Sequence, residues 1–65
     1  MRKTGKTPRI DPPEKDHHAK HFDEALRNAL DQWEPGDPTD VEITFAATIA
    51  ENPGGIREYR VTISG

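Results

Sequence analysis

The end of the chain, residues 40–65, reads DVEITFAATIAENPGGIREYRVTISG and alternates apolar with polar residues in two runs. Successive side chains along a strand point to opposite faces, so residues two apart share a face. The alternation therefore predicts two strands, each with one apolar face. The apolar residues are Val41, Ile43, Phe45, Ala47 and Ile49 in the first run and Tyr59, Val61 and Ile63 in the second.

The glycine-containing connection predicts that the two strands form an antiparallel β-hairpin. A two-residue loop at positions 53–54 would place the two apolar runs on opposite faces of the hairpin. A three-residue loop of Pro53, Gly54 and Gly55 places them on the same face, and it supplies proline and glycine where a type I turn with a bulge requires them. We therefore expect the longer loop, which gives the pairs Ile49–Tyr59, Ala47–Val61 and Phe45–Ile63.

The segment before the hairpin, residues 16–33, has the periodicity of an amphipathic helix. Its apolar side chains share one arc, which consists of Ala19, Phe22, Leu26, Ala29, Leu30 and Trp33. Proline and glycine in the stretch 33–38, WEPGDP, predict the end of the helix. Two starts are compatible with the sequence, because Asp11 with Glu14 resembles a capping box and Asp16 is a second possible cap.

The start of the chain is basic and poor in apolar residues. Its basic residues Arg2, Lys3, Lys6 and Arg9 all precede the first acidic residue, Asp11. Such a composition buries too little apolar area to offset the entropy of ordering the segment. We therefore expect a flexible basic tail over residues 1–13 and one small domain over residues 14–65.

These elements predict an α+β fold in which one amphipathic helix packs on an antiparallel hairpin, in the order α-β-β. A domain of 65 residues is marginally stable, and a lone hairpin leaves both of its edges open. We therefore expect a homo-oligomer formed through a hairpin edge or a sheet face. The predicted core consists of Phe22, Leu26, Ala29, Leu30, Trp33, Val41, Ile43, Phe45, Ile49, Tyr59, Val61 and Ile63.

Charge and composition exclude several classes of partner. The formal net charge is −3, with 9 basic and 12 acidic residues, which disfavours nucleic acid as a partner of the whole chain. Weak binding of nucleic acid or an acidic partner through the basic tail remains an alternative. No apolar run is long enough to cross a bilayer, so we expect no membrane partner. The absence of cysteine fits the reducing cytoplasm, which is the expected location.

The residues that carry chemistry are few, so we expect a noncatalytic protein without a cofactor. The chain has no cysteine, and its one serine is Ser64, close to the end. His17 and His21 have the i, i+4 spacing at which two imidazoles share a metal, but the glutamate of the HExxH zinc pattern is missing. We expect these two histidines to be solvated, and they are the candidate ligands if a metal binds.

The segments HFDEALRNALDQ, VEITFAATIA and IREYRVTIS together resemble the dodecins, small flavin-binding proteins in which a helix precedes two long antiparallel strands. The likeness spans Asp16 to Ser64 and includes the Tyr59 and Val61 pair. Dodecins have a further strand before the helix, and their flavin-stacking tryptophan opens the next strand, whereas Trp33 belongs to the helix end here. The resemblance implies a shared fold fragment and oligomerisation. Its functional implication is an alternative hypothesis, a planar cofactor such as flavin held between copies near Trp33 and Tyr59.

Overall fold

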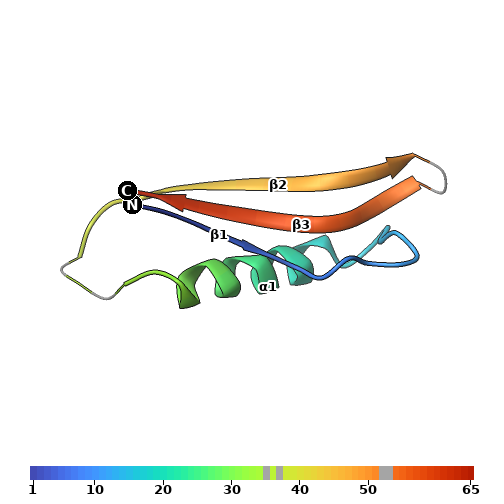
Figure 1. Cartoon of the computed structure of the whole chain (residues 1–65). Helices are drawn as coiled ribbons and strands as arrows, with labels where there is room; N and C mark the ends of the chain where they lie inside the picture. The colour runs from blue at the N-terminus through green and yellow to red at the C-terminus, as the bar shows by residue number, and fades with distance from the viewer. Residues whose placement is uncertain (35, 37, 52–53) are drawn as a thin grey trace.

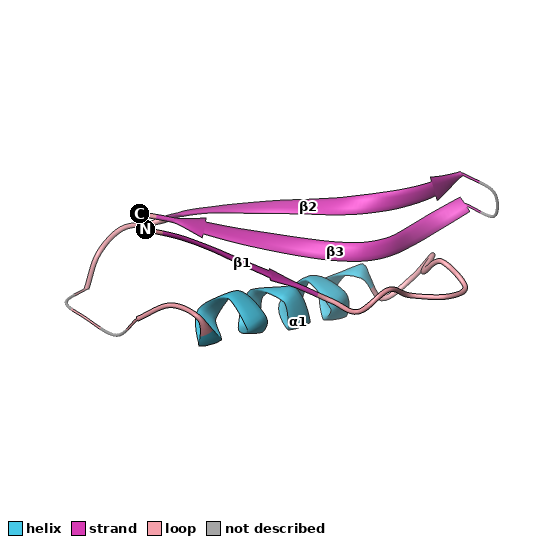
Figure 2. Cartoon of the chain, viewed as in Figure 1, coloured by secondary structure: helices cyan, strands magenta, loops and turns pink. Residues whose placement is uncertain are grey.

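In the part of the chain that the structure describes, a three-stranded antiparallel sheet carries one helix on one face (Figures 1 and 2). The computed structural model describes residues 1–34, 36, 38–51 and 54–65. The elements follow the order β1 (Arg2–Lys6), α1 (His18–Asp31), β2 (Glu42–Glu51) and β3 (Gly54–Ser64). In the sheet, β3 lies in the centre, between β1 and β2. The predicted α+β class and the antiparallel pairing of the last two strands are thus confirmed.

The strand β1 corrects the prediction for the start of the chain. We expected a flexible tail over residues 1–13, but residues 2–6 pair antiparallel with β3, with Lys3 opposite Ile63 and Gly5 opposite Val61. The order is therefore β-α-β-β, and the two-stranded hairpin becomes a three-stranded sheet. We did not predict this strand from the composition of residues 1–13, because a strand that is held by backbone pairing with β3 requires few apolar side chains of its own.

Close contact between the helix and β1 depends on small residues. A Cβ atom at Gly5 would overlap the backbone of Ala25 and Ala29 in α1. Both alanines have no exposed surface. Glycine at position 5 therefore allows the helix to lie directly on β1, and α1 packs over β1 and β3.

The position of the helix changes the predicted core. Tyr59, Val61 and Ile63 of β3 are buried, as predicted. On the strand β2, however, Phe45 is 55% exposed and Ile49 is 70% exposed. The reason is that β1 adds a strand on the far side of β3, so that α1 covers β1 and β3 and leaves β2 at its margin. The side chains of Leu30, Val41 and Ile43 are exposed for the same reason.

The register of β2 and β3 differs by two residues from the prediction. The observed pairs are Ile43↔Ile63, Phe45↔Val61 and Ala47↔Tyr59. The predicted common face is nevertheless correct. At the carboxyl end of β2, odd-numbered residues of β2 pair with even-numbered residues of β3, as in Ile49↔Ile56. One extra residue in β3, at an irregularity between Thr48 and Ile49, changes this register, so that on the other side of it the odd-numbered apolar residues of both strands are paired and share a face. Gly54 and Gly55 belong to β3 and not to the predicted loop, whereas Pro53 lies outside the described residues.

The segment between β1 and α1 follows the far end of β3 instead of beginning the helix early. The N–H of Ile10 donates to the carbonyl of Arg57 (2.8 Å), and Glu14 and Ile56 form an antiparallel bridge. Helix α1 begins only after His17, whose φ is 59° and whose side chain makes no capping bond. Neither predicted cap, Asp11 or Asp16, therefore starts the helix.

Candidate functional site

The most distinctive surface is an apolar one between α1 and β2, which we call the open apolar face. It arises because the alternation in β2 directs apolar side chains to the side of the sheet that carries α1, while the helix covers the other two strands. Phe22 and Phe45 meet there edge to face, with ring centroids 5.3 Å apart. The open apolar face consists of Phe22, Leu26, Leu30, Val41, Ile43, Phe45 and Ile49.

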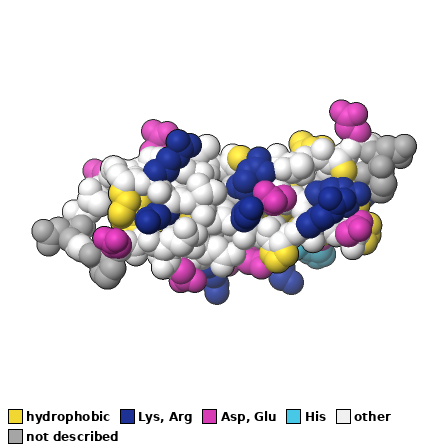
Figure 3. Space-filling model, in the orientation of Figure 1, with side chains coloured by type: hydrophobic (Ala, Val, Ile, Leu, Met, Phe, Trp, Pro, Cys, Tyr) yellow, Lys and Arg dark blue, Asp and Glu magenta, His cyan; other side chains and the backbone are white. Residues whose placement is uncertain are grey.

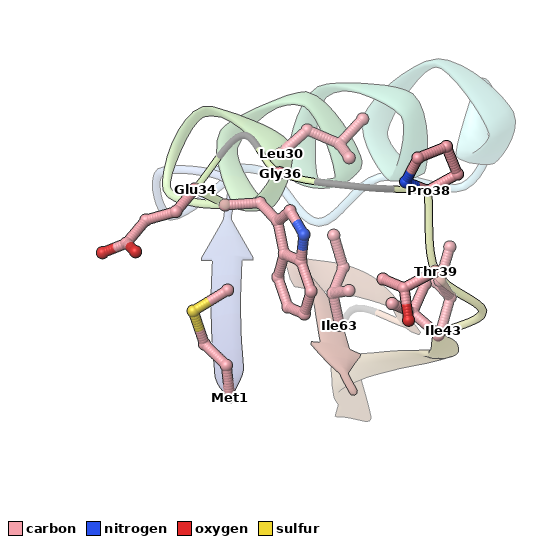
Figure 4. Close-up of a pocket in the computed structure, with 10 residues that line it drawn as sticks. Met1, Leu30, Glu34, Gly36, Pro38, Thr39, Ile43 and Ile63 are labelled. Atoms are coloured by element: carbon pink, nitrogen blue, oxygen red, sulfur yellow. The ribbon is translucent and has the colours of Figure 1, made fainter.

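Two hollows mark the open apolar face. The first, of about 480 Å³, lies between the helix residues Ala19, Phe22 and Leu26 and the side chain of Phe45. The second, of about 560 Å³, lies beyond the carboxyl end of the helix (Figure 4). Leu30, Ile43 and Ile63 line this second hollow, together with Trp33. Both hollows are therefore bounded by α1 on one side and β2 on the other.

The outer edge of β2 is also open. The sheet order β1-β3-β2 places this strand at an edge, with no further strand beside it in the part of the chain that the structure describes. Its ten residues, Glu42–Glu51, include no proline, lysine or arginine. Edge strands of natural proteins are usually short, charged or interrupted, because a long regular edge pairs readily with another strand.

The opposite face of the sheet is polar. Thr4 and Thr62 share a hydrogen bond of 3.0 Å between their hydroxyl groups, and Arg60 donates to Thr48 (2.7 Å) and to Glu58 (3.1 Å). Lys and Arg side chains are spread along the molecule among acidic ones (Figure 3). The basic residues of β1 are divided between the two faces of the sheet, since Arg2 and Lys6 alternate with Lys3.

A cluster of aromatic and titratable side chains surrounds Tyr59. Its hydroxyl group is 2.6 Å from Nδ1 of His18. The ring of His21 stacks on the tyrosine ring, with centroids 4.9 Å apart and an interplanar angle of 17°, and Phe22 meets it edge to face. Nε2 of His21 in turn lies 3.2 Å from Oε2 of Glu14. The cluster therefore joins the start of α1 to the centre of the sheet.

The environment changes two pKa values in this cluster. Burial raises the pKa of the Tyr59 phenol, and the charge of Glu14 acts in the same direction. A hydrogen bond from the backbone N–H of Asp16 lowers the pKa of Glu14, and the hydrogen bond with His21 lowers it further. Both pKa shifts favour the protonation state that the group normally has at neutral pH, which is a neutral phenol for Tyr59 and a charged carboxylate for Glu14. These shifts are those of a packing contact between the helix and the sheet.

The candidate metal ligands are not brought together into a site. His21 contacts Glu14 and Tyr59, while His17 occupies the residue before the helix. Within the described ranges, no group of three or more histidine, aspartate or glutamate side chains is arranged to hold a metal ion.

The candidate ligand-stacking residues lie at different ends of the helix. Tyr59 has no exposed surface, and His21 and Phe22 occupy its ring, so it is not available to a ligand. Trp33 follows the carboxyl end of α1 and lines the hollow of Figure 4. The open apolar face is the surface that the sequence analysis did not predict. The regular alternation in β2 indicated an apolar strand face, but we assigned its side chains to the core of one copy.

No helix in the described segments is long and apolar enough to cross a membrane. Comparison of the chain with protein-family models, with curated proteins and with solved structures finds no match.

Proposed function

We propose that this protein is a small noncatalytic assembly module whose copies associate through the open apolar face. The observation that carries the proposal is the exposure of large apolar side chains along β2, above all Phe45 and Ile49. Isolated apolar residues are common on protein surfaces, but here several gather in one patch, in which Phe45 lines one hollow and Val41 and Ile43 line the other. Such a patch is typical of a surface that a partner covers.

The size of the patch supports the same proposal. An aromatic side chain has roughly 150–250 Å² to bury, so a half-exposed Phe45 leaves on the order of 100 Å² in water. Together with its apolar neighbours, Phe45 brings the exposed apolar area toward the several hundred Å² that mark interaction surfaces. Polar residues at the rim would extend the contact area toward the roughly 800 Å² that each partner buries in a stable complex. At about 25 cal/mol per Å², covering it contributes several kcal/mol.

A pair of lysine substitutions tests the proposal. Ile49→Lys places a charge on the open apolar face at a position that is 70% exposed, so the fold of one copy should tolerate it while association weakens at least tenfold. Asp31→Lys is the control, because Asp31 is an exposed residue at the end of α1 and lines neither hollow. Sedimentation over a range of concentrations measures the effect. Equal association of the two variants and the unchanged protein would exclude this face as the interface.

A second candidate function is the binding of a planar cofactor in the hollow beside Trp33. The observation that favours it is the apolar lining of that hollow. The strand before the helix, a feature of dodecins, adds a likeness in architecture alone. Trp33 is the only tryptophan, so its fluorescence reports directly on a flavin bound there. Saturable quenching by flavin that Ile43→Glu abolishes is the expected result, and unchanged fluorescence would exclude this candidate.

A further inference from the structure

The open edge of β2 indicates how two copies would meet. We propose that β2 pairs antiparallel with β2 of a second copy about a two-fold axis at Ala46, which joins the two sheets into one of six strands. The proposal rests on the assembly function proposed above and specifies its geometry.

The two edges of the sheet differ in a way that favours β2. The strand β1 has five residues and carries Arg2, Lys3 and Lys6, so pairing with a second β1 would bring like charges together. The strand β2 has ten residues and is charged only at its two ends, Glu42 and Glu51. Lysine-rich and short edges resist pairing, whereas a long edge without them invites it.

Hydrogen bonds on the other side of the sheet determine which groups of β2 point outward. The carbonyl of Tyr59 accepts from Thr7, and the N–H of Gly65 donates to Met1, so the odd-numbered residues of β3 bond toward β1. Backbone groups of successive residues in an antiparallel sheet point to alternate edges. From Glu58 to Ser64, before the irregularity, the even-numbered residues of β3 therefore bond toward β2. The N–H and C=O groups of Phe45 and Ala47 accordingly point away from β3, where a further strand would pair with them.

The side chains of β2 match a copy of themselves about this axis. Each residue then lies opposite the residue equally distant from Ala46, which gives the pairs Phe45 with Ala47, Ile43 with Ile49 and Thr44 with Thr48. The large phenylalanine meets a small alanine, and threonine meets threonine, both of which are favourable cross-strand arrangements. Glu42 meets Ala50, so no two charges of β2 oppose each other.

The joined sheet would also cover the open apolar face. A two-fold axis perpendicular to the sheet keeps both helices on the same side. Strands lie about 4.8 Å apart, so helices above β1 and β3 of each copy would be separated by roughly 19 Å. Packed helices are about 8–10 Å apart, which leaves a space over the two central strands. Phe45 and Ile49 of both copies, with Phe22 at the sides, are the side chains that fill this space.

Disulfide formation by single-cysteine variants tests the register. The chain has no cysteine, so each introduced thiol reports on itself alone. In the proposed dimer Ala46 lies opposite its own copy, and the Cα atoms of such a pair, about 4.5–5.5 Å apart, are within the range for a disulfide. Ala46→Cys should therefore give a covalent dimer under mild oxidation. Thr44→Cys, on the same face, would lie about 13 Å from its copy and should remain uncrosslinked.

A third variant distinguishes the register from chance collision. Thr44 lies opposite Thr48 of the second copy, so the double variant Thr44→Cys with Thr48→Cys should crosslink although Thr44→Cys alone does not. This pattern of three results supports the proposal. If sedimentation shows an oligomer but Thr44→Cys crosslinks as readily as Ala46→Cys, the edge pairing is wrong and the assembly function stands. If the protein without substitutions sediments as a monomer at all concentrations, the assembly function itself is wrong.

Discussion

Tyr59 is the residue on which the packing of the helix against the sheet is centred. Its hydroxyl group contacts His18, His21 stacks on its ring, and its backbone N–H donates to the hydroxyl of Thr7 (3.2 Å). The sequence predicted that Tyr59 faces the helix, because it shares a strand face with Val61 and Ile63. The sequence did not predict its partners His18 and His21. We expected His21 to be solvated, but the helix is rotated so that its alanines face the sheet, and this rotation brings both histidines to Tyr59.

The raised pKa of Tyr59 predicts loss of stability at alkaline pH. Because the folded pKa lies above the ordinary value of 10.0, the folded state holds the phenol proton more tightly than the unfolded state does. The stabilisation is complete at pH values below the ordinary pKa of 10.0, and it is lost as the pH rises through the folded pKa. Since Tyr59 is the only tyrosine, tyrosinate absorbance follows it directly.

In that titration we expect a midpoint above the ordinary value, which returns to about 10 when the protein is unfolded in denaturant. Tyr59→Phe should remove the alkaline loss of stability while retaining the ring contacts. A folded-state midpoint equal to the midpoint in denaturant would contradict the burial of the phenol.

At the scale of elements, the helix and the last two strands could be predicted and the first strand could not. Periodicity identifies α1, β2 and β3 because each has a regular apolar pattern over many residues. Residues 2–6, RKTGK, have no such pattern, because β1 is held by backbone pairing with β3 and by the helix lying on Gly5. The register was wrong because the irregularity near Thr48 has no clear signature in the sequence.

The contact between β1 and α1 predicts a strong effect of a methyl group at Gly5. Gly5→Ala would force the helix away from the strand, since its Cβ atom would overlap the helix backbone. We expect a loss of about 1–3 kcal/mol or more in the free energy of unfolding, measured by denaturant titration. Gly36→Ala is the control, because a Cβ atom there meets nothing within 4 Å. Equal stability of the two variants would show that α1 does not rest on β1.

At the scale of the whole molecule, the open apolar face follows from the position of β1. A chain of this size buries limited apolar area, and here the helix covers the strands on one side of the sheet while β2 remains at the margin. The alternation of β2 predicted that one of its faces would be covered. It did not reveal what covers that face, because intramolecular and intermolecular burial impose the same pattern on a strand.

The proposed assembly also changes what a core substitution should do. Val61→Ala removes a fully buried side chain of β3 and should destabilise one copy at every concentration. Phe45→Ala removes a side chain that is 55% exposed, so its main effect should be on association. The difference between the two variants in the concentration dependence of thermal unfolding measures this distinction. The same concentration dependence for both variants would contradict it.

Sedimentation equilibrium of the unsubstituted protein over a wide range of concentrations tests the central claim most directly. We predict that the average mass rises from that of one chain, 7.3 kDa, to at least twice that value within the micromolar range. A mass of one chain at every concentration, with the protein folded, would show that the open apolar face stays in water and would contradict the proposed assembly.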